Sequence, residues 1–208
     1  MSKKLRVALI GDSQSEVLWP LLQKLMPQHD FVLVRTQRGW FELQYKNEGK
    51  LAQELLDAKP DLVIVELGGN NYLSSDSKYQ SNVDWVLSAA RSGGARQILW
   101  VGPAAAAKEP FKTNKEWTRS FQERYLPKQA DVIWMDSFPY TKSGHADDGV
   151  HFKDRGVHRA WAAGIEQQVL GLRQGDMLPA GPRVPVVAAA AGVLLGSILI
   201  ALVLRKLL

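Results

Sequence analysis

Five short apolar runs recur along the first 180 residues, and each is nearly continuous rather than alternating with polar positions. Continuous apolar runs of four to eight residues are typical of strands that are covered on both faces. The runs are rich in β-branched residues, which favour strands. We therefore expect five strands, at residues 5–10, 31–35, 62–67, 98–101 and 132–135.

The segments between these runs repeat their apolar residues with a helical period. Leucines at 18, 21, 22 and 25 form one stripe, and residues 51–56 and 83–90 form two more. A last helix is expected from Asp154, a residue suited to an N-cap, and it carries apolar residues at steps of four from 157 to 169. Alternating strands and helices predict an α/β fold, a three-layer α/β/α sandwich around a parallel, flavodoxin-like sheet.

The pattern changes after residue 172. Glycines and prolines cluster between 171 and 185, which indicates a linker, and residues 184–204 then carry no charge. As a helix, these 21 residues would span about 30 Å, the thickness of a bilayer's hydrocarbon core. We expect a globular domain at 1–172, a linker at 173–183 and a single transmembrane anchor at 184–208, with the lipid bilayer as a partner.

Composition narrows the classes of function further. The net charge of +5 is mild and no long basic run is present, so nucleic acid is not an expected partner. The chain has no cysteine, which excludes disulfides and thiol nucleophiles. The apolar run near the N-terminus ends after five residues, which is short for a signal peptide and suits a first strand.

Residues able to perform acyl transfer follow the predicted strands, where parallel sheets bind ligands. Gly-Asp-Ser occupies 11–13, Gly39 follows the second strand, Gly-Gly-Asn occupies 68–70, and Asp148 precedes His151 by three positions. A serine hydroxyl needs a base such as histidine, and the histidine needs a carboxylate that orients it. Backbone N–H groups and an amide could hold the oxyanion.

These four blocks, in this order and spacing, resemble the signature of SGNH (GDSL-like) hydrolases. The resemblance covers about residues 5–172 and implies a serine hydrolase with a five-stranded flavodoxin-like fold and no cofactor. It implies Ser13 as nucleophile, His151 as base and Asp148 as its orienting acid. The oxyanion hole would comprise the N–H groups of Ser13 and Gly39 and the amide of Asn70.

Each residue also has a structural interpretation. Ser13 could cap a helix beginning near Gln14, and residues 68–71 could form an ordinary turn. Asp147 competes with Asp148, and His145 competes with His151. The third block of the family often ends in Asp, whereas this chain has Asn71. Only Gly39 marks the second block, and with few histidines and no carboxylate cluster near them we expect no metal site.

Three aromatic residues flank the predicted site and are candidates for substrate binding: Trp40, Tyr72 and Phe152. Aromatic walls suit sugar faces or acyl chains, so the expected substrate is an acetylated carbohydrate or an acyl ester. The alternative is a non-catalytic protein on an SGNH scaffold, structural or glycan-binding, such as a virion component. The expected location is a membrane, viral or host envelope included, and neither its sidedness nor an oligomeric state follows from the sequence.

Overall fold

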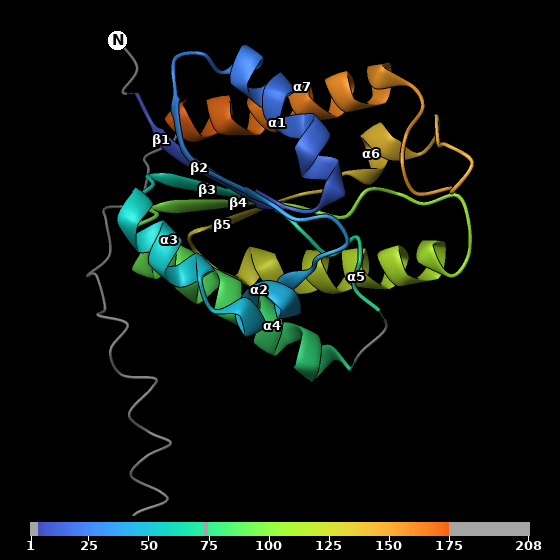
Figure 1. The fold of residues 1–208 in the computed structure, drawn as a ribbon, viewed down its shortest axis with the longest axis horizontal. Coiled ribbons are helices and arrows are strands. Elements are labelled where there is room, and N and C mark those ends of the chain that lie inside the picture. The colour runs from blue at the N-terminus through green and yellow to red at the C-terminus, as the bar shows by residue number, and fades with distance from the viewer. Residues whose placement is uncertain (1–3, 73–74, 175–208) are drawn as a thin grey trace, which may run out of the picture.

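The computed structural model describes residues 4–72 and 75–174, which form an α/β fold around one parallel sheet (Figure 1). The sheet has five strands in the order β2-β1-β3-β4-β5, and every neighbouring pair is parallel. The strands match the five expected apolar runs: β1 Arg6–Gly11, β2 Asp30–Thr36, β3 Leu62–Glu66, β4 Gln97–Val101 and β5 Val132–Met135.

Helices cover both faces of the sheet, as right-handed crossovers between parallel strands require. In Figure 1, α1 and α7 lie on one side of the sheet, and α2, α3, α4 and α5 lie on the other. The helices are α1 Ser13–Leu25, α2 Glu42–Glu48, α3 Leu51–Ala58, α4 Asp76–Ser92, α5 Phe111–Tyr125, α6 Phe138–Thr141 and α7 Arg155–Gln174, with a short 3₁₀ helix at Leu126–Lys128.

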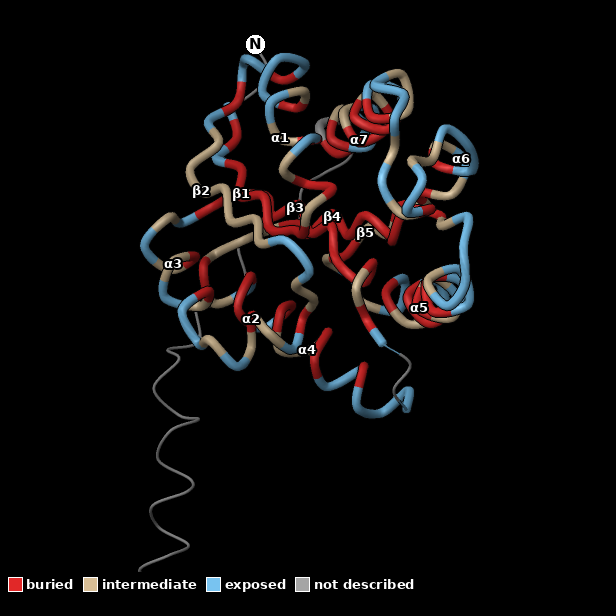
Figure 2. Tube along the Cα trace, turned by 45° about the vertical axis from the view of Figure 1, so that its right-hand side comes forward, coloured by how far each residue is buried: buried red, intermediate tan, exposed pale blue. Residues whose placement is uncertain are grey.

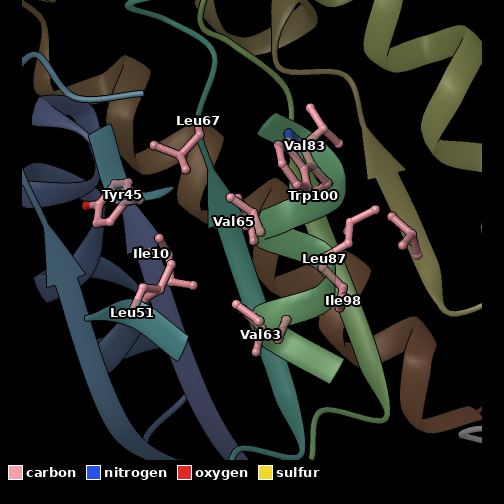
Figure 3. Close-up of a cluster of buried hydrophobic side chains, with 14 of the residues drawn as sticks. Ile10, Tyr45, Leu51, Val63, Val65, Leu67, Val83, Leu87, Ile98 and Trp100 are labelled. Atoms are coloured by element: carbon pink, nitrogen blue, oxygen red, sulfur yellow. The ribbon is translucent and has the colours of Figure 1, made fainter. Parts of the chain in front are cut away.

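The strands separate two hydrophobic cores because successive side chains point to opposite faces. On β1, Leu9 belongs to the core under α1 and α7, whereas its neighbour Ile10 belongs to the core under the other helices. Figure 2 shows the central strands buried and the outer helix surfaces exposed. In the second core, Ile10 and Val65 of the sheet pack with residues such as Leu51, Leu87 and Trp100 (Figure 3).

Helices α2, α5 and α6 and the 3₁₀ helix at Leu126–Lys128 were not expected from the apolar pattern. The buried residues of α5 are mostly polar, so an apolar stripe does not mark them. At the other end of the domain, α7 continues to Gln174, so the first residues of the expected linker are helical.

No helix in the described part of the chain is both long enough and apolar enough to span a bilayer. The segment at 184–204, for which we expect the membrane anchor, lies outside the described residues.

Candidate active site

Ser13 and His151 are 138 positions apart in the sequence and meet at the carboxyl edge of the sheet. Ser13 is the first residue of α1, directly after β1, and its Oγ lies 3.1 Å from His151 Nε2. The other ring nitrogen, Nδ1, lies 2.7 Å from Asp148 Oδ2. The three side chains thus form a continuous Ser-His-Asp chain of hydrogen bonds, the arrangement that activates a serine hydroxyl.

The loop before α7 holds the acid and the base together. Asp148 Oδ1 accepts hydrogen bonds from the backbone N–H groups of Val150 and His151, both at 2.9 Å. The hydrogen bond to the His151 ring, aided by these backbone bonds, holds the pKa of Asp148 below its usual range, so the carboxyl is ionised at neutral pH. A fixed carboxylate on Nδ1 leaves Nε2 facing the serine.

The competing acid and base are engaged elsewhere. The carboxylate of Asp147 forms an ion pair with Lys153 at 2.6 Å. His145 Nε2 lies 3.1 Å from the carbonyl oxygen of Ala105. Of the candidate acids and bases, Asp148 and His151 are the pair whose side chains lie within hydrogen-bonding distance of each other, and His151 also lies within that distance of Ser13.

Helix capping is performed by Asp12 rather than by Ser13. Asp12 adopts an extended backbone, and its Oδ1 accepts a hydrogen bond from the N–H of Gln14 at 2.9 Å. This cap satisfies an N–H at the start of α1 that would otherwise have no partner within the helix. Ser13 Oγ is consequently free to face His151, at the positive end of the helix dipole.

Asn70 connects the loops that follow the first three strands. Its Nδ2 donates to Asp12 Oδ2 at 2.7 Å and lies 3.3 Å from the carbonyl oxygen of Trp40. The amide thus stands beside the residue that precedes Ser13, and the loop containing Gly39 is held against it. Because both amide hydrogens already have acceptors, an oxyanion would have to replace one of them, and the longer contact to Trp40 is the weaker.

Glycines shape the two loops that carry the predicted oxyanion donors. Gly39 has φ +73° and Gly68 has φ +107°, a region that residues with a side chain rarely adopt. A Cβ on Gly68 would also lie 2.7 Å from Thr118 Cγ2 and 2.7 Å from Gln122 Nε2. The Gly68 position is therefore fixed both by backbone conformation and by the close approach of α5.

A buried polar cluster under the site was not identified from the sequence. It joins Asp12, which is 2% exposed, to Glu66 at the end of β3 and to Lys115 of α5, which are each 1% exposed. Ser15 Oγ donates to Glu66 Oε2 at 2.8 Å. A glutamate that ends an otherwise apolar strand was the available signal for Glu66, whereas nothing in the sequence distinguished Lys115.

The charges in this cluster offset each other. Burial raises the pKa of Asp12, and the Gln14 N–H and the Lys115 ammonium oppose that rise. Burial and the nearby Asp12 charge raise the pKa of Glu66 well above its usual value. Burial lowers the pKa of Lys115. The nearby Asp12 charge thus favours the protonated form of Glu66, whereas the Gln14 N–H and Lys115 favour the ionised form of Asp12, which also accepts the Asn70 amide.

The aromatic residues predicted to bind substrate occupy different surroundings. Tyr72 is 67% exposed and lines a cavity of about 500 Å³ between α2 and α4. Phe152 is half-buried and lines a cavity of about 730 Å³ beside α1 and α7. Trp40 packs edge-on against the buried ring of Tyr45, with ring centroids 5.1 Å apart, so much of its ring serves the core.

Metal ligands are not grouped in the described part of the chain. Residues 4–72 and 75–174 contain no group of three or more His, Asp or Glu side chains that could hold an ion.

Comparison with solved structures places the fold among those of SGNH/GDSL lipase-acylhydrolases and acetylesterases. A lipase/acylhydrolase from Enterococcus faecalis is similar with a TM-score of 0.65 and 18% identity, over 80% of this chain and 95% of that one. The catalytic domain of a peptidoglycan O-acetyltransferase from Streptococcus pneumoniae gives 0.65 and 16%, over 86% and 99%. A carbohydrate acetylesterase from Sinorhizobium meliloti gives 0.64 and 14%, over 82% and 100%.

Sequence comparison alone does not find these relationships. No protein-family model matches the chain, and no curated protein matches it. At 14–18% identity the structural likeness establishes the fold.

Proposed function

We propose that this chain is a membrane-anchored serine esterase that uses Ser13, His151 and Asp148 to hydrolyse acyl esters, with O-acetylated carbohydrate as the preferred class. The observation that carries the proposal is the Ser13–His151–Asp148 chain of hydrogen bonds, at 3.1 and 2.7 Å. Neighbours with the same fold include a carbohydrate acetylesterase and a family 3 carbohydrate esterase, which supports the choice of substrate.

The proposed reaction follows from this geometry. Ser13 Oγ attacks the ester carbonyl carbon while His151 Nε2 accepts its proton, and Asp148 stabilises the resulting imidazolium. The tetrahedral oxyanion receives N–H groups from Ser13 and Gly39 and the amide of Asn70. His151 then returns the proton to the leaving alcohol, and water releases the acyl group from Ser13 by the same steps.

Hydrolysis of p-nitrophenyl acetate by the wild-type chain and by Ser13→Ala tests this proposal. We expect turnover by the wild-type chain and a loss of at least about a thousandfold in kcat for the variant, because the nucleophile is gone. A fluorophosphonate probe should label Ser13 only in the wild-type chain. Equal rates for the wild-type chain and Ser13→Ala, with both proteins folded, would favour a non-catalytic structural or glycan-binding role on this scaffold.

The membrane anchor is the second part of the proposal, and it rests on the uncharged run at 184–204. The two hydrophobic cores lie within the described residues, so a chain that stops at residue 174 should fold by itself. We expect the full chain to float with neutral phosphatidylcholine vesicles in a density gradient and the shortened chain to remain at the bottom. Flotation of both chains, or of neither, would contradict the anchor.

A further inference from the structure

A cationic groove lies next to the proposed catalytic residues, on the face covered by α1 and α7. It has a volume of about 730 Å³. Its walls combine aliphatic and aromatic side chains with four cations, and the lining residues are Val17, Pro20, Leu21, Lys24, Phe152, Lys153, Arg155, His158 and Arg159.

Two of the residues that line the groove are close neighbours of the triad in the sequence. Val17 is one helical turn beyond Ser13, so both side chains project from the same face of α1. Phe152 directly follows His151. From Val17 to Lys24 the helix rises about 10 Å, so a molecule in the groove could extend from the reacting ester for that distance.

The positive charge of the groove is largely uncompensated. Among the described residues no carboxylate forms an ion pair with Lys24, Arg155 or Arg159. Lys153 is paired with Asp147.

Other groups near the groove remove little of this charge. Glu16, the acid next to Val17, is paired with Arg38 at 2.7 Å, and Asp154 Oδ1 accepts the N–H of Gly156. Burial lowers the pKa of His158, so the ring that lines the groove is neutral at pH 7. The Asp154 carboxylate offsets the positive dipole end of α7 through its hydrogen bond with Gly156, but among the described residues no carboxylate lines the groove itself. The residues that line the groove therefore carry a net positive charge, which favours the binding of an anion.

A second cationic cavity lies on the opposite side of the site. The cavity of about 500 Å³ adjoins Asn71 and Tyr72, which follow the proposed oxyanion residue Asn70, and it is lined by Lys46 and Lys78. A ligand with one charged headgroup would occupy only one of the two cavities. A polymer with repeated charges could occupy both while it passes Ser13.

We propose that the groove binds an acidic O-acylated polysaccharide, with its carboxylates on Lys24, Arg155 and Arg159 and its sugar faces against Val17 and Phe152. The inference rests on the proposed esterase function and specifies the substrate class of that site. The rings of uronic acids combine apolar C–H faces with an edge that carries a carboxylate, and this combination matches aliphatic and aromatic walls that also carry cations.

The test uses the full chain and two forms of one polymer, O-acetylated polygalacturonate with free carboxylates and the same polymer with its carboxylates methyl-esterified. We expect acetate release with a kcat/KM at least about tenfold higher on the free acid at low salt, and a smaller preference at high salt. Arg155→Glu and Arg159→Glu should each raise KM for the acidic polymer about tenfold. Their kcat/KM on p-nitrophenyl acetate, which carries no carboxylate, should fall by less than their kcat/KM on the acidic polymer.

These variants have a matched control. Arg155→Glu places a carboxylate in the first turn of α7, where the helix dipole favours it, and Arg159 is exposed, so both variants should retain the fold. Lys128→Glu reverses an exposed charge outside both cavities and should leave every rate unchanged.

Three results would overturn the inference. One is an equal kcat/KM on the two polymers by an enzyme that is active on p-nitrophenyl acetate. Another is an increase in KM for the acidic polymer that is as large in Lys128→Glu as in the groove variants. The third is an unchanged KM for the acidic polymer in the groove variants, when the same substitutions in the chain that stops at residue 174 abolish binding to phosphatidylglycerol vesicles, which would make the groove a lipid site. If p-nitrophenyl acetate is not hydrolysed, the proposed function fails, and calorimetric binding of deacetylated polygalacturonate still tests the groove.

Discussion

At the scale of single residues, Asp12 links catalysis to the fold more closely than its place in a Gly-Asp-Ser motif suggests. One carboxylate oxygen caps α1, and the other accepts the Asn70 amide at 2.7 Å. The motif predicted that Ser13 and His151 would share a site, and the structure places them in hydrogen-bonding distance. The charge beneath them could not be predicted, because Lys115 becomes a counter-ion only when α5 packs under β3.

The adjacent aspartates 147 and 148 provide a matched pair of variants. In Asp148→Asn the ring of His151 loses its carboxylate partner, and an amide can hold the wrong tautomer. We expect kcat on p-nitrophenyl acetate to fall about 10³- to 10⁴-fold at pH 7.5. In Asp147→Asn only the ion pair with Lys153 is lost, so kcat should stay within twofold of the wild-type value. Similar losses in both variants would contradict the assignment of the acid.

At the scale of elements, the helical repeat of apolar residues predicted the helices that bury leucine or valine. It did not predict the helices that bury mainly polar side chains. Helix α5 buries Asn114, Lys115, Thr118 and Gln122. Helix α2 has seven residues and buries only Glu42 and Tyr45. These side chains are buried because partners across the fold satisfy them, as Tyr79 does by donating to Glu42 Oε1 at 2.8 Å. Such partners lie far away in sequence, so no local pattern contains them.

The buried carboxyl of α2 should make stability depend on pH. Burial raises the pKa of Glu42 to about 7, from 4.5 in the unfolded chain. Between these values the folded state holds a proton that the unfolded state has lost, so the free energy of unfolding falls as pH rises from 4.5 through 7. The loss should reach about 3 kcal/mol.

Glu42→Gln removes the titrating group and keeps an acceptor for Tyr79. Urea unfolding at pH 5 and pH 8 should give a smaller difference between the two pH values for this variant than for the wild-type chain. The variant should be the more stable protein at pH 8. An identical pH dependence in both proteins would mean that Glu42 is not the group responsible.

At the scale of the whole molecule, the expected parallel sheet and its central strands are confirmed, and with them the edge at which the signature residues meet. The order of strands and signature residues along the chain was sufficient to predict this edge, because the carboxyl ends of parallel strands share one edge of the sheet. The cavities could not be foreseen in the same way. Their cations come from the outward surfaces of α1, α2, α4 and α7, where a sequence shows only ordinary solvated lysines and arginines.

The direction of α7 has a consequence for how the molecule meets its substrate. This helix begins a few residues after His151 and runs back along the sheet for 20 residues, or about 30 Å, ending beside the start of β1 (Figure 1). The candidate active site and the last described residue therefore lie at opposite ends of α7. A molecule held by its C-terminal end would present the candidate active site outward. The site would then face a polymer at some distance and point away from the surface that holds the molecule.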